Sequence, residues 1–252
     1  MSFRKKIKAF TVAEVLITLS IIGVVGALVF GSVIPNIQER VLVTKLKNVY
    51  AQLNSSFEVA VRMYGPPQYW NLEISNLTTN KETGLTDAKY PAAKKQLMML
   101  LAGLSVEDIE KENILYNHYS LHGTDFTGNT ETQPLYRTKD GVVFLEKSLI
   151  SSPTCEKVVS TVNETLKYTC GEIKLDLNGA QGPNRYGKDI HVFYFTRKGI
   201  VPVGTKEEDK GKNLTQHCSK DSKERLNGFA CSAWVIYNGN MNYLKKNIFW
   251  AK

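Results

Sequence analysis

The chain has 252 residues, of which 42% are hydrophobic and 22% are charged, and its formal net charge is +8. This length accommodates one sizeable domain or two small ones, with enough apolar residues for a packed core. Four of the positive charges lie within residues 1–9, so the rest of the chain carries about +4 and a nucleic-acid partner is not indicated.

A long apolar run follows the basic N-terminal segment. Residues 10–34 read FTVAEVLITLSIIGVVGALVFGSVI, in which Glu14 is the one acidic residue. About 20 apolar residues suffice for a helix to span a bilayer, and basic residues before the span place that side in the cytoplasm. We therefore expect a single-pass membrane helix with the remainder of the chain outside the cytoplasm. A carboxylate inside such a span is costly and indicates a function.

The stretch KAFTVAEVLITLSIIGVVGALV resembles the N-terminal signature of type IV pilins and type II secretion pseudopilins. In that signature a short basic leader precedes a small residue, then Phe, then Thr or Ser, with a Glu at the fifth mature position. The resemblance implies that a prepilin peptidase cuts between Ala9 and Phe10 and methylates the new amino group of Phe10. Glu14 would then pair with the terminal amine of a neighbouring subunit. The family usually has Gly before the cut, whereas this chain has Ala9.

The resemblance also implies a function in assembly. The chain would be a structural subunit, a pilin or a pseudopilin, of a type IV filament or a type II secretion pseudopilus. Its partners would be membrane lipid, copies of itself or other pilins, and an inner-membrane assembly platform. It would reside in the inner membrane and then in a cell-surface or periplasmic filament. Two alternatives stay open: a membrane-anchored receptor or adhesin head that does not polymerise, and a minor tip subunit with an adhesive or DNA-binding role.

Beyond Pro35 the pattern becomes amphipathic. Apolar residues recur every three or four positions, which predicts one buried helical face: Leu42, Leu46, Val49, Leu53, Phe57, Ala60 and Tyr64. The helix should continue to about Tyr64, where Gly65-Pro66-Pro67 ends it, and Pro35 should kink or locally melt it. We thus expect a leader at residues 1–9, the membrane and assembly half of the helix at 10–34, and a pilin-like globular head at 35–252 that includes the amphipathic half.

The sequence pattern of the rest of the head predicts an antiparallel sheet that packs against this helix. We therefore expect an α+β fold. Residues 135–138 and 142–146 flank Lys139-Asp140-Gly141, a hairpin signal. Residues 172–177 and 189–195 alternate polar with apolar side chains, and 233–237 should form another strand before the turn dipeptide Asn238-Gly239. Short helices are expected at 91–101 and after Ser105, a candidate N-cap. Residues 68–86, 117–132 and 205–213 should be loops, the second exposed and the third mobile.

Four cysteines follow the proposed export signal: Cys155, Cys170, Cys218 and Cys231. An even number of cysteines on an oxidising side of the membrane favours disulfides. A zinc site would prefer C-x2-C pairs, and the sequence contains none. Four cysteines allow three connectivities. The short separations favour the local pairs Cys155–Cys170 and Cys218–Cys231, each worth about 3 kcal/mol in the loop-entropy model.

No catalytic motif is present, and the four histidines show no ligand spacing, so we expect a protein that is not an enzyme and whose histidines lie on the surface or in strands. One polar loop, residues 176–189, combines glycines with hard oxygen donors. Asp176, Asn178 and Asp189 could share a calcium ion with backbone carbonyls. The loop resembles the acidic, Gly-rich segment of secretion pseudopilins in which calcium holds a loop in place. A metal-free Asn-Gly turn with Asx hydrogen bonds explains the same composition.

Overall fold

The computed structural model describes residues 10–70, 78–79, 86–87, 98–109, 117–125, 134–145, 152, 154–208 and 213–250. Ala9 and the rest of the predicted leader lie outside this described part. The chain divides into two units, residues 1–41 and 42–252, and each is described by itself below. We refer to the second unit as the head.

Helix α1, Val12–Tyr64, confirms the prediction of one helix from the apolar run to Tyr64, and Pro35 lies inside it. The helix ends because Gly65 adopts a left-handed conformation, with φ of 77°, and two prolines follow. The N–H of Gly65 donates to the carbonyl of Val61 at 2.9 Å, which satisfies one of the last carbonyls of the helix.

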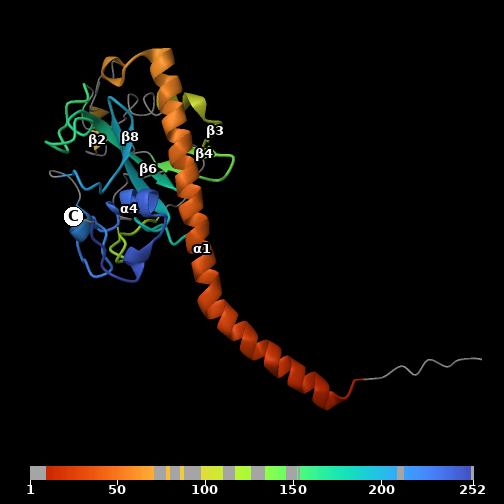
Figure 1. The fold of residues 1–252 in the computed structure, drawn as a ribbon. Helices are drawn as coiled ribbons and strands as arrows, with labels where there is room; N and C mark the ends of the chain where they lie inside the picture. Colours follow the sequence, from red (N-terminus) through yellow and green to blue (C-terminus); the bar gives the residue numbers. More distant parts are fainter. Residues whose placement is uncertain are drawn as a thin grey trace, which may run out of the picture. The chain divides into compact units, whose positions relative to one another are not determined.

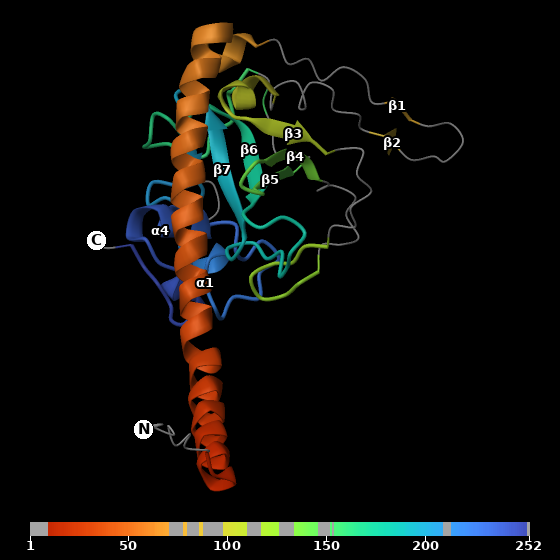
Figure 2. The ribbon, with the colours of Figure 1, turned by 90° about the vertical axis from the view of Figure 1, so that its right-hand side faces the viewer.

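Six strands of the head form one antiparallel sheet in which each strand pairs with the next along the chain (Figures 1 and 2). The strands are β3 (Val106–Asp108), β4 (Pro134–Thr138), β5 (Val143–Leu145), β6 (Thr169–Asp176), β7 (Ile190–Thr196) and β8 (Ile200–Pro202). A separate pair consists of β1 (Thr78–Thr79) and β2 (Thr86–Asp87). The α+β class and the hairpin at residues 139–141 are confirmed.

The core lies on both faces of this sheet. All seven residues of β7 are buried. Because side chains alternate between the two faces of a strand, the apolar ones belong to two hydrophobic clusters, one on each face of the sheet. Phe193 and Phe195 join the cluster that includes the head half of α1, which crosses one face of the sheet (Figure 2). Val192 and Tyr194 join a second cluster on the other face.

Aromatic contacts fix the head half of α1 on the sheet. The ring of Tyr50 stacks on that of Phe193 with centroids 5.5 Å apart, and Phe57 meets Phe195 edge to face at 6.0 Å. The Tyr50 hydroxyl donates to the carbonyl of Ile200 at 3.1 Å. Aromatic pairs of this kind contribute about 0.5–1.5 kcal/mol beyond the area they bury.

The predicted apolar face of α1 is largely confirmed. Its buried positions are Leu46, Val49, Leu53, Phe57 and Ala60. At the two ends of this face the structure differs from the prediction. Leu42 is half-buried while Val43 beside it is buried, and Tyr64 remains 42% exposed. Tyr64 instead contacts the ring of Trp70, which follows the short 3-10 helix η1 (Pro67–Tyr69).

Two element predictions are wrong. The expected strand at 233–237 is helix α4, Cys231–Asn238, and Asn238-Gly239 ends it because Gly239 is a left-handed C-cap with φ of 66°. The expected helix N-cap at Ser105 is followed by strand β3, whose three residues pair with β4. Tertiary packing decides both cases and overrides the local preferences of these short segments.

The other helices that the structure describes are short. They are η2 (Leu101–Gly103), α3 (Leu214–His217) and η3 (Asn242–Leu244). Residues 98–100 are helical, which agrees with the end of the helix expected at 91–101, whereas 91–97 lie outside the described part.

Three loop predictions need correction. The segment expected to be a loop at 68–86 contains strand β1 and the first residue of β2. In the segment expected to be exposed, His118 and Ser120 are buried, and the N–H of Leu121 donates to the carbonyl of Asn227 at 2.8 Å. In the segment expected to be a mobile loop, Glu208 is buried: its carboxylate accepts hydrogen bonds from the hydroxyl of Tyr194 and the N–H of Gly204. Polar composition predicted exposure, but satisfied hydrogen bonds permit burial.

Candidate functional site

The described residues of the first unit present an exposed apolar helical surface. Phe10 is 84% exposed and Val12 is 78% exposed. The large apolar side chains from Val15 to Val29 are also exposed. In the described part of the chain, α1 is the one helix long and apolar enough to cross a membrane.

Thr11 and Glu14 together begin this helix. One carboxylate oxygen of Glu14, Oε2, accepts hydrogen bonds from the N–H and the hydroxyl of Thr11, both at 2.9 Å. In return, the N–H of Glu14 donates to the Thr11 hydroxyl oxygen at 3.3 Å. This reciprocal arrangement is a capping box, which satisfies N–H groups that have no partner at the start of a helix. The sequence prediction did not include this role, although the spacing T-x-x-E indicates it.

The polar side chains farther along the apolar run are satisfied within the helix. The hydroxyl of Thr18 donates to the carbonyl of Val15 at 2.9 Å, and that of Ser20 donates to the carbonyl of Leu16 at 2.8 Å. Such bonds to the preceding turn allow hydroxyl residues to lie in a hydrocarbon environment, where unsatisfied polar groups are costly.

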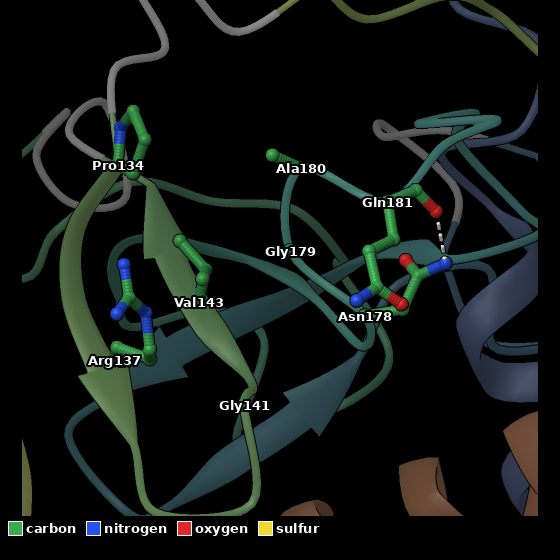
Figure 3. A pocket seen from close by; sticks show the side chains of 8 residues that line it. All are labelled: Pro134, Arg137, Gly141, Val143, Asn178, Gly179, Ala180 and Gln181. Carbon is green, nitrogen blue, oxygen red and sulfur yellow. Dashed lines mark hydrogen bonds between the residues drawn. The ribbon is translucent and has the colours of Figure 1, made fainter. Parts of the chain in front are cut away.

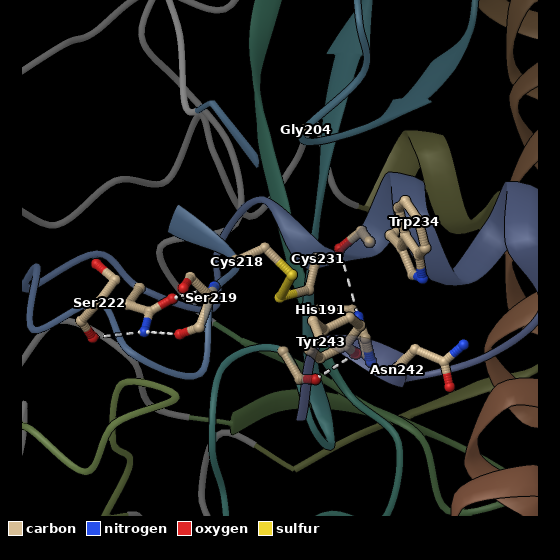
Figure 4. Close-up of a disulfide and its surroundings, with 12 residues drawn as sticks. His191, Gly204, Cys218, Ser219, Ser222, Cys231, Trp234, Asn242 and Tyr243 are labelled. Carbon is tan, nitrogen blue, oxygen red and sulfur yellow. Dashed lines mark hydrogen bonds between the residues drawn. A yellow bond between two sulfur atoms is a disulfide. The ribbon is translucent and has the colours of Figure 1, made fainter. Parts of the chain in front are cut away.

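Both favoured disulfides are present: Cys155–Cys170 and Cys218–Cys231, with no free cysteine. The first ties the segment before β6 to that strand. The second joins the end of α3 to the first residue of α4 (Figure 4). Both bridges therefore fasten irregular segments of the head to elements that pack on the sheet.

The candidate calcium loop begins where β6 ends. Asp176 is buried, and its Oδ1 accepts hydrogen bonds from the N–H groups of Asn178 and Gly179 at 2.9 and 3.0 Å. The side-chain nitrogen of Asn178 donates to the carbonyl of Gln181 at 2.6 Å (Figure 3). This is an Asx turn closed by the loop's own hydrogen bonds.

Asp189 closes the other end of the loop just before β7. It is buried, and its two carboxylate oxygens accept hydrogen bonds from the N–H groups of Asn184 at 2.9 Å and Arg185 at 2.5 Å. Burial raises the pKa of Asp189, although the N–H groups of Arg185 and Asn184 favour its charged form. The N–H of Leu177 donates to the Asp189 carbonyl at 2.9 Å, which joins the two ends of the loop.

These contacts give the predicted calcium ligands a role that requires no metal. Asp176 and Asp189 direct carboxylate oxygens at backbone N–H groups, which occupy positions that a cation would need. Within the described residues, no three His, Cys, Asp or Glu side chains gather closely enough to hold a metal ion. The residues present therefore fit a turn held by hydrogen bonds better than a calcium cage, and calcium binding stays a prediction.

Two of the four histidines are buried. His191 lies in β7 as expected of a strand histidine, and its Nδ1 is 3.4 Å from the hydroxyl of Ser232 (Figure 4). Burial lowers the pKa of His191 to about 4. His118 is buried in a loop against the ring of Tyr186, so the expectation of a surface or strand position is wrong for it.

Comparison of the chain with models of known protein families, with characterised proteins and with solved structures finds no match.

Proposed function

We propose that this chain is a structural subunit, a pilin or a pseudopilin, of a type IV filament or a type II secretion pseudopilus. The observation that supports the proposal is an exposed apolar helix with a single carboxylate in its first turn, Glu14. The head contributes no enzymatic chemistry to this function. It is the part carried outward by the helix.

The exposed apolar residues of α1 require an environment other than water. Each large apolar side chain gains about 1.5–3 kcal/mol when it is buried, so the run from Val12 to Val29 cannot remain bare in solution. Lipid covers it while the subunit waits in the inner membrane. A bundle of such helices covers it in a filament, and the transfer keeps apolar surface away from water throughout.

Glu14 gives this transfer a direction. In lipid its carboxylate has only local hydrogen-bond donors to oppose the cost of a buried charge. After a prepilin peptidase has cut between Ala9 and Phe10, a neighbouring subunit offers a terminal amine, and the ion pair favours the assembled state. The head then lies on the cell surface or in the periplasm, served by an inner-membrane assembly platform.

The test is processing followed by assembly of the full-length chain. Co-expression with a prepilin peptidase and an assembly platform should yield a mature protein that has lost residues 1–9 and gained one methyl group, measured by intact mass. Sheared filaments should contain it. An uncleaved chain that remains in the membrane fraction would instead support an anchored receptor or adhesin head.

A matched control separates failed recognition from failed assembly. Ala9→Gly restores the residue usual in the family, so it should be processed at least as fast as the wild type. If neither form is cleaved by an active peptidase, the filament proposal is wrong.

A further inference from the structure

The head half of α1 and strand β7 begin at the same end of the head. Tyr50 contacts Phe193 of β7, and the later helix residue Phe57 contacts a later residue of that strand, so α1 and β7 run in the same direction. Residues 185–189, which precede β7, therefore lie at the end of the head where α1 enters it. Residues 35–41 join this end of the head to the apolar run.

Segments that are distant in the sequence gather at this end. The hydroxyl of Tyr243 donates to the carbonyl of Gly187 at 2.6 Å. The side-chain oxygen of Asn247 accepts a hydrogen bond from the Ser219 hydroxyl, and its nitrogen donates to the carboxylate of Asp221, both at 3.2 Å. Figure 4 shows Ser219 and Tyr243 beside the second disulfide. We refer to the surface formed here by residues 117–125, 183–189, 218–228 and 242–249 as the proximal surface.

The proximal surface carries most of the excess positive charge of the chain. It contains seven Lys and Arg against four Asp and Glu, a net +3, whereas residues 10–252 together carry about +4. All seven cations are exposed: Arg185, Lys188, Lys220, Lys223, Arg225, Lys245 and Lys246. Two of the acids have partners within the head, since Asp189 is buried against backbone N–H groups and Asp221 lies 2.6 Å from the Nζ of Lys220.

The same surface combines available cations with exposed apolar side chains. Lys223 and Lys246 are exposed, and neither forms an ion pair with another described residue. Leu226 is 37% exposed and Phe249 is 67% exposed on the same two segments. Lysines beside exposed apolar side chains are typical of protein surfaces that lie in the headgroup region of an anionic bilayer.

We propose that the proximal surface docks on the anionic phospholipid headgroups of the membrane that holds the apolar helix. The inference rests on the membrane helix of the proposed function. Residues 35–41 span at most about 25 Å, so this end of the head stays close to the bilayer at any angle between the two units. The bilayer offers a negative surface to Lys223 and Lys246 and an apolar layer to Phe249. Extraction of a subunit from the membrane must therefore break these contacts as well as remove the helix from lipid.

The test is amine labelling of the full-length, uncleaved protein in lipid nanodiscs, measured at each lysine by mass spectrometry. Discs of phosphatidylcholine are compared with discs of equal parts phosphatidylcholine and phosphatidylglycerol. Anionic lipid should slow the labelling of Lys223 and Lys246 about fivefold or more. Lys198 is exposed beyond the other end of β7 and should react equally in both discs. About 1 M salt should remove the protection, because it shortens the Debye length to about 3 Å.

Three results would overturn the proposal. Equal labelling of Lys223 and Lys246 in both kinds of disc would show that the head does not dock. Equal protection by a soluble DNA oligonucleotide in phosphatidylcholine discs would show a general polyanion surface. A chain that fails to enter the discs would refute the membrane helix on which both proposals rest. Failure of cleavage by a prepilin peptidase would contradict the filament proposal alone, because the labelled chain is uncleaved.

Charge-reversal variants locate the docking surface. Anionic lipid should also protect Lys220, and Lys223→Glu combined with Lys246→Glu should abolish that protection. Lys157→Glu combined with Lys198→Glu changes the net charge equally at the other end of β6 and β7 and should leave Lys220 protected. Thermal unfolding of both variants confirms folding. Unchanged protection of Lys220 in the first variant would contradict the assignment.

Discussion

The carboxylate of Glu14 is held by Thr11, which donates to it from both its backbone N–H and its hydroxyl. Glu14 therefore has a local role at the start of α1 as well as the proposed role in pairing with a neighbouring subunit. Replacing Glu14 with Ala removes both roles at once. An assembly defect in that variant would not distinguish a lost ion pair from a frayed first turn.

Glu14→Gln separates the two roles, because glutamine can complete a capping box but carries no charge. We predict that Glu14→Gln and Glu14→Ala both insert into the membrane normally, and that each reduces filament incorporation about tenfold or more, because the proposed ion pair is lost. Thr11→Ala keeps the charge and should reduce incorporation much less. The measurement is the yield of the subunit in sheared filaments relative to its amount in the membrane. Normal yield from Glu14→Gln would show that the charge is not required.

The second prediction concerns the two disulfides. Removing Cys155–Cys170 by double replacement with Ala should lower the free energy of unfolding by about 3 kcal/mol, and removing Cys218–Cys231 should cost a similar amount, because each bridge closes a short loop. Denaturant titration of the oxidised wild type and both variants measures these costs. Thiol titration of the denatured wild type should find none free, and a linked peptide containing Cys170 and Cys218 would contradict the pairing.

The third prediction concerns calcium. If the loop at residues 176–189 binds it, a hundredfold excess over the dissociation constant would add about 2.7 kcal/mol of stability and raise the melting temperature. Asp176→Ala or Asp189→Ala should remove the effect, whereas Asp221→Ala, an exposed control, should not. Scanning calorimetry with calcium, magnesium and chelator measures it. A melting temperature unmoved by calcium would leave the hydrogen-bonded turn as the complete explanation.

The fourth prediction is that the head loses stability in mild acid. His191 has an unfolded pKa near 6.5 that burial lowers to about 4, so the unfolded chain binds more protons between these values. His191 thus contributes its full stability above about pH 6.5, and up to about 3 kcal/mol is lost as the pH falls towards 4. The raised pKa of Asp189 acts in the opposite direction and reduces the net slope.

His191→Asn isolates the contribution of His191 to the pH dependence of stability, because asparagine does not titrate. The free energy of unfolding of this variant, measured by denaturant titration at several pH values, should change less between pH 6.5 and 4 than that of the wild type. Parallel curves for the wild type and His191→Asn would contradict the prediction.

The parts of the structure predicted from sequence are those governed by local periodicity. Leu46, Leu53 and Phe57 follow the helical repeat and are buried as expected. The strands at β6 and β7 follow the alternation of side chains on the two faces of the sheet. Gly65 and the prolines after it end α1 because their backbone restrictions are intrinsic.

Other elements depend on partners distant in the sequence. The segment containing Val235 and Ile236 has residues that favour strands, yet it is a helix fixed by the bridge at Cys231 and by the bond from the N–H of Ala233 to the carbonyl of Val203. The approach of residues 178–181 to the β4–β5 hairpin could not be predicted either, because the two segments are far apart in the chain. No local pattern encodes such contacts.

The pairing of each strand with its neighbour in sequence has a consequence for the growing chain. During synthesis, every strand from β4 onward meets a partner that has already been made. The head half of α1 is the exception, since Leu53 and Phe57 are made early and Phe195 of β7 is made late. A nascent or truncated chain that stops before β7 therefore lacks the rings of Phe193 and Phe195 that pack on Tyr50 and Phe57, so part of the apolar face of its first helix stays exposed until β7 has been made.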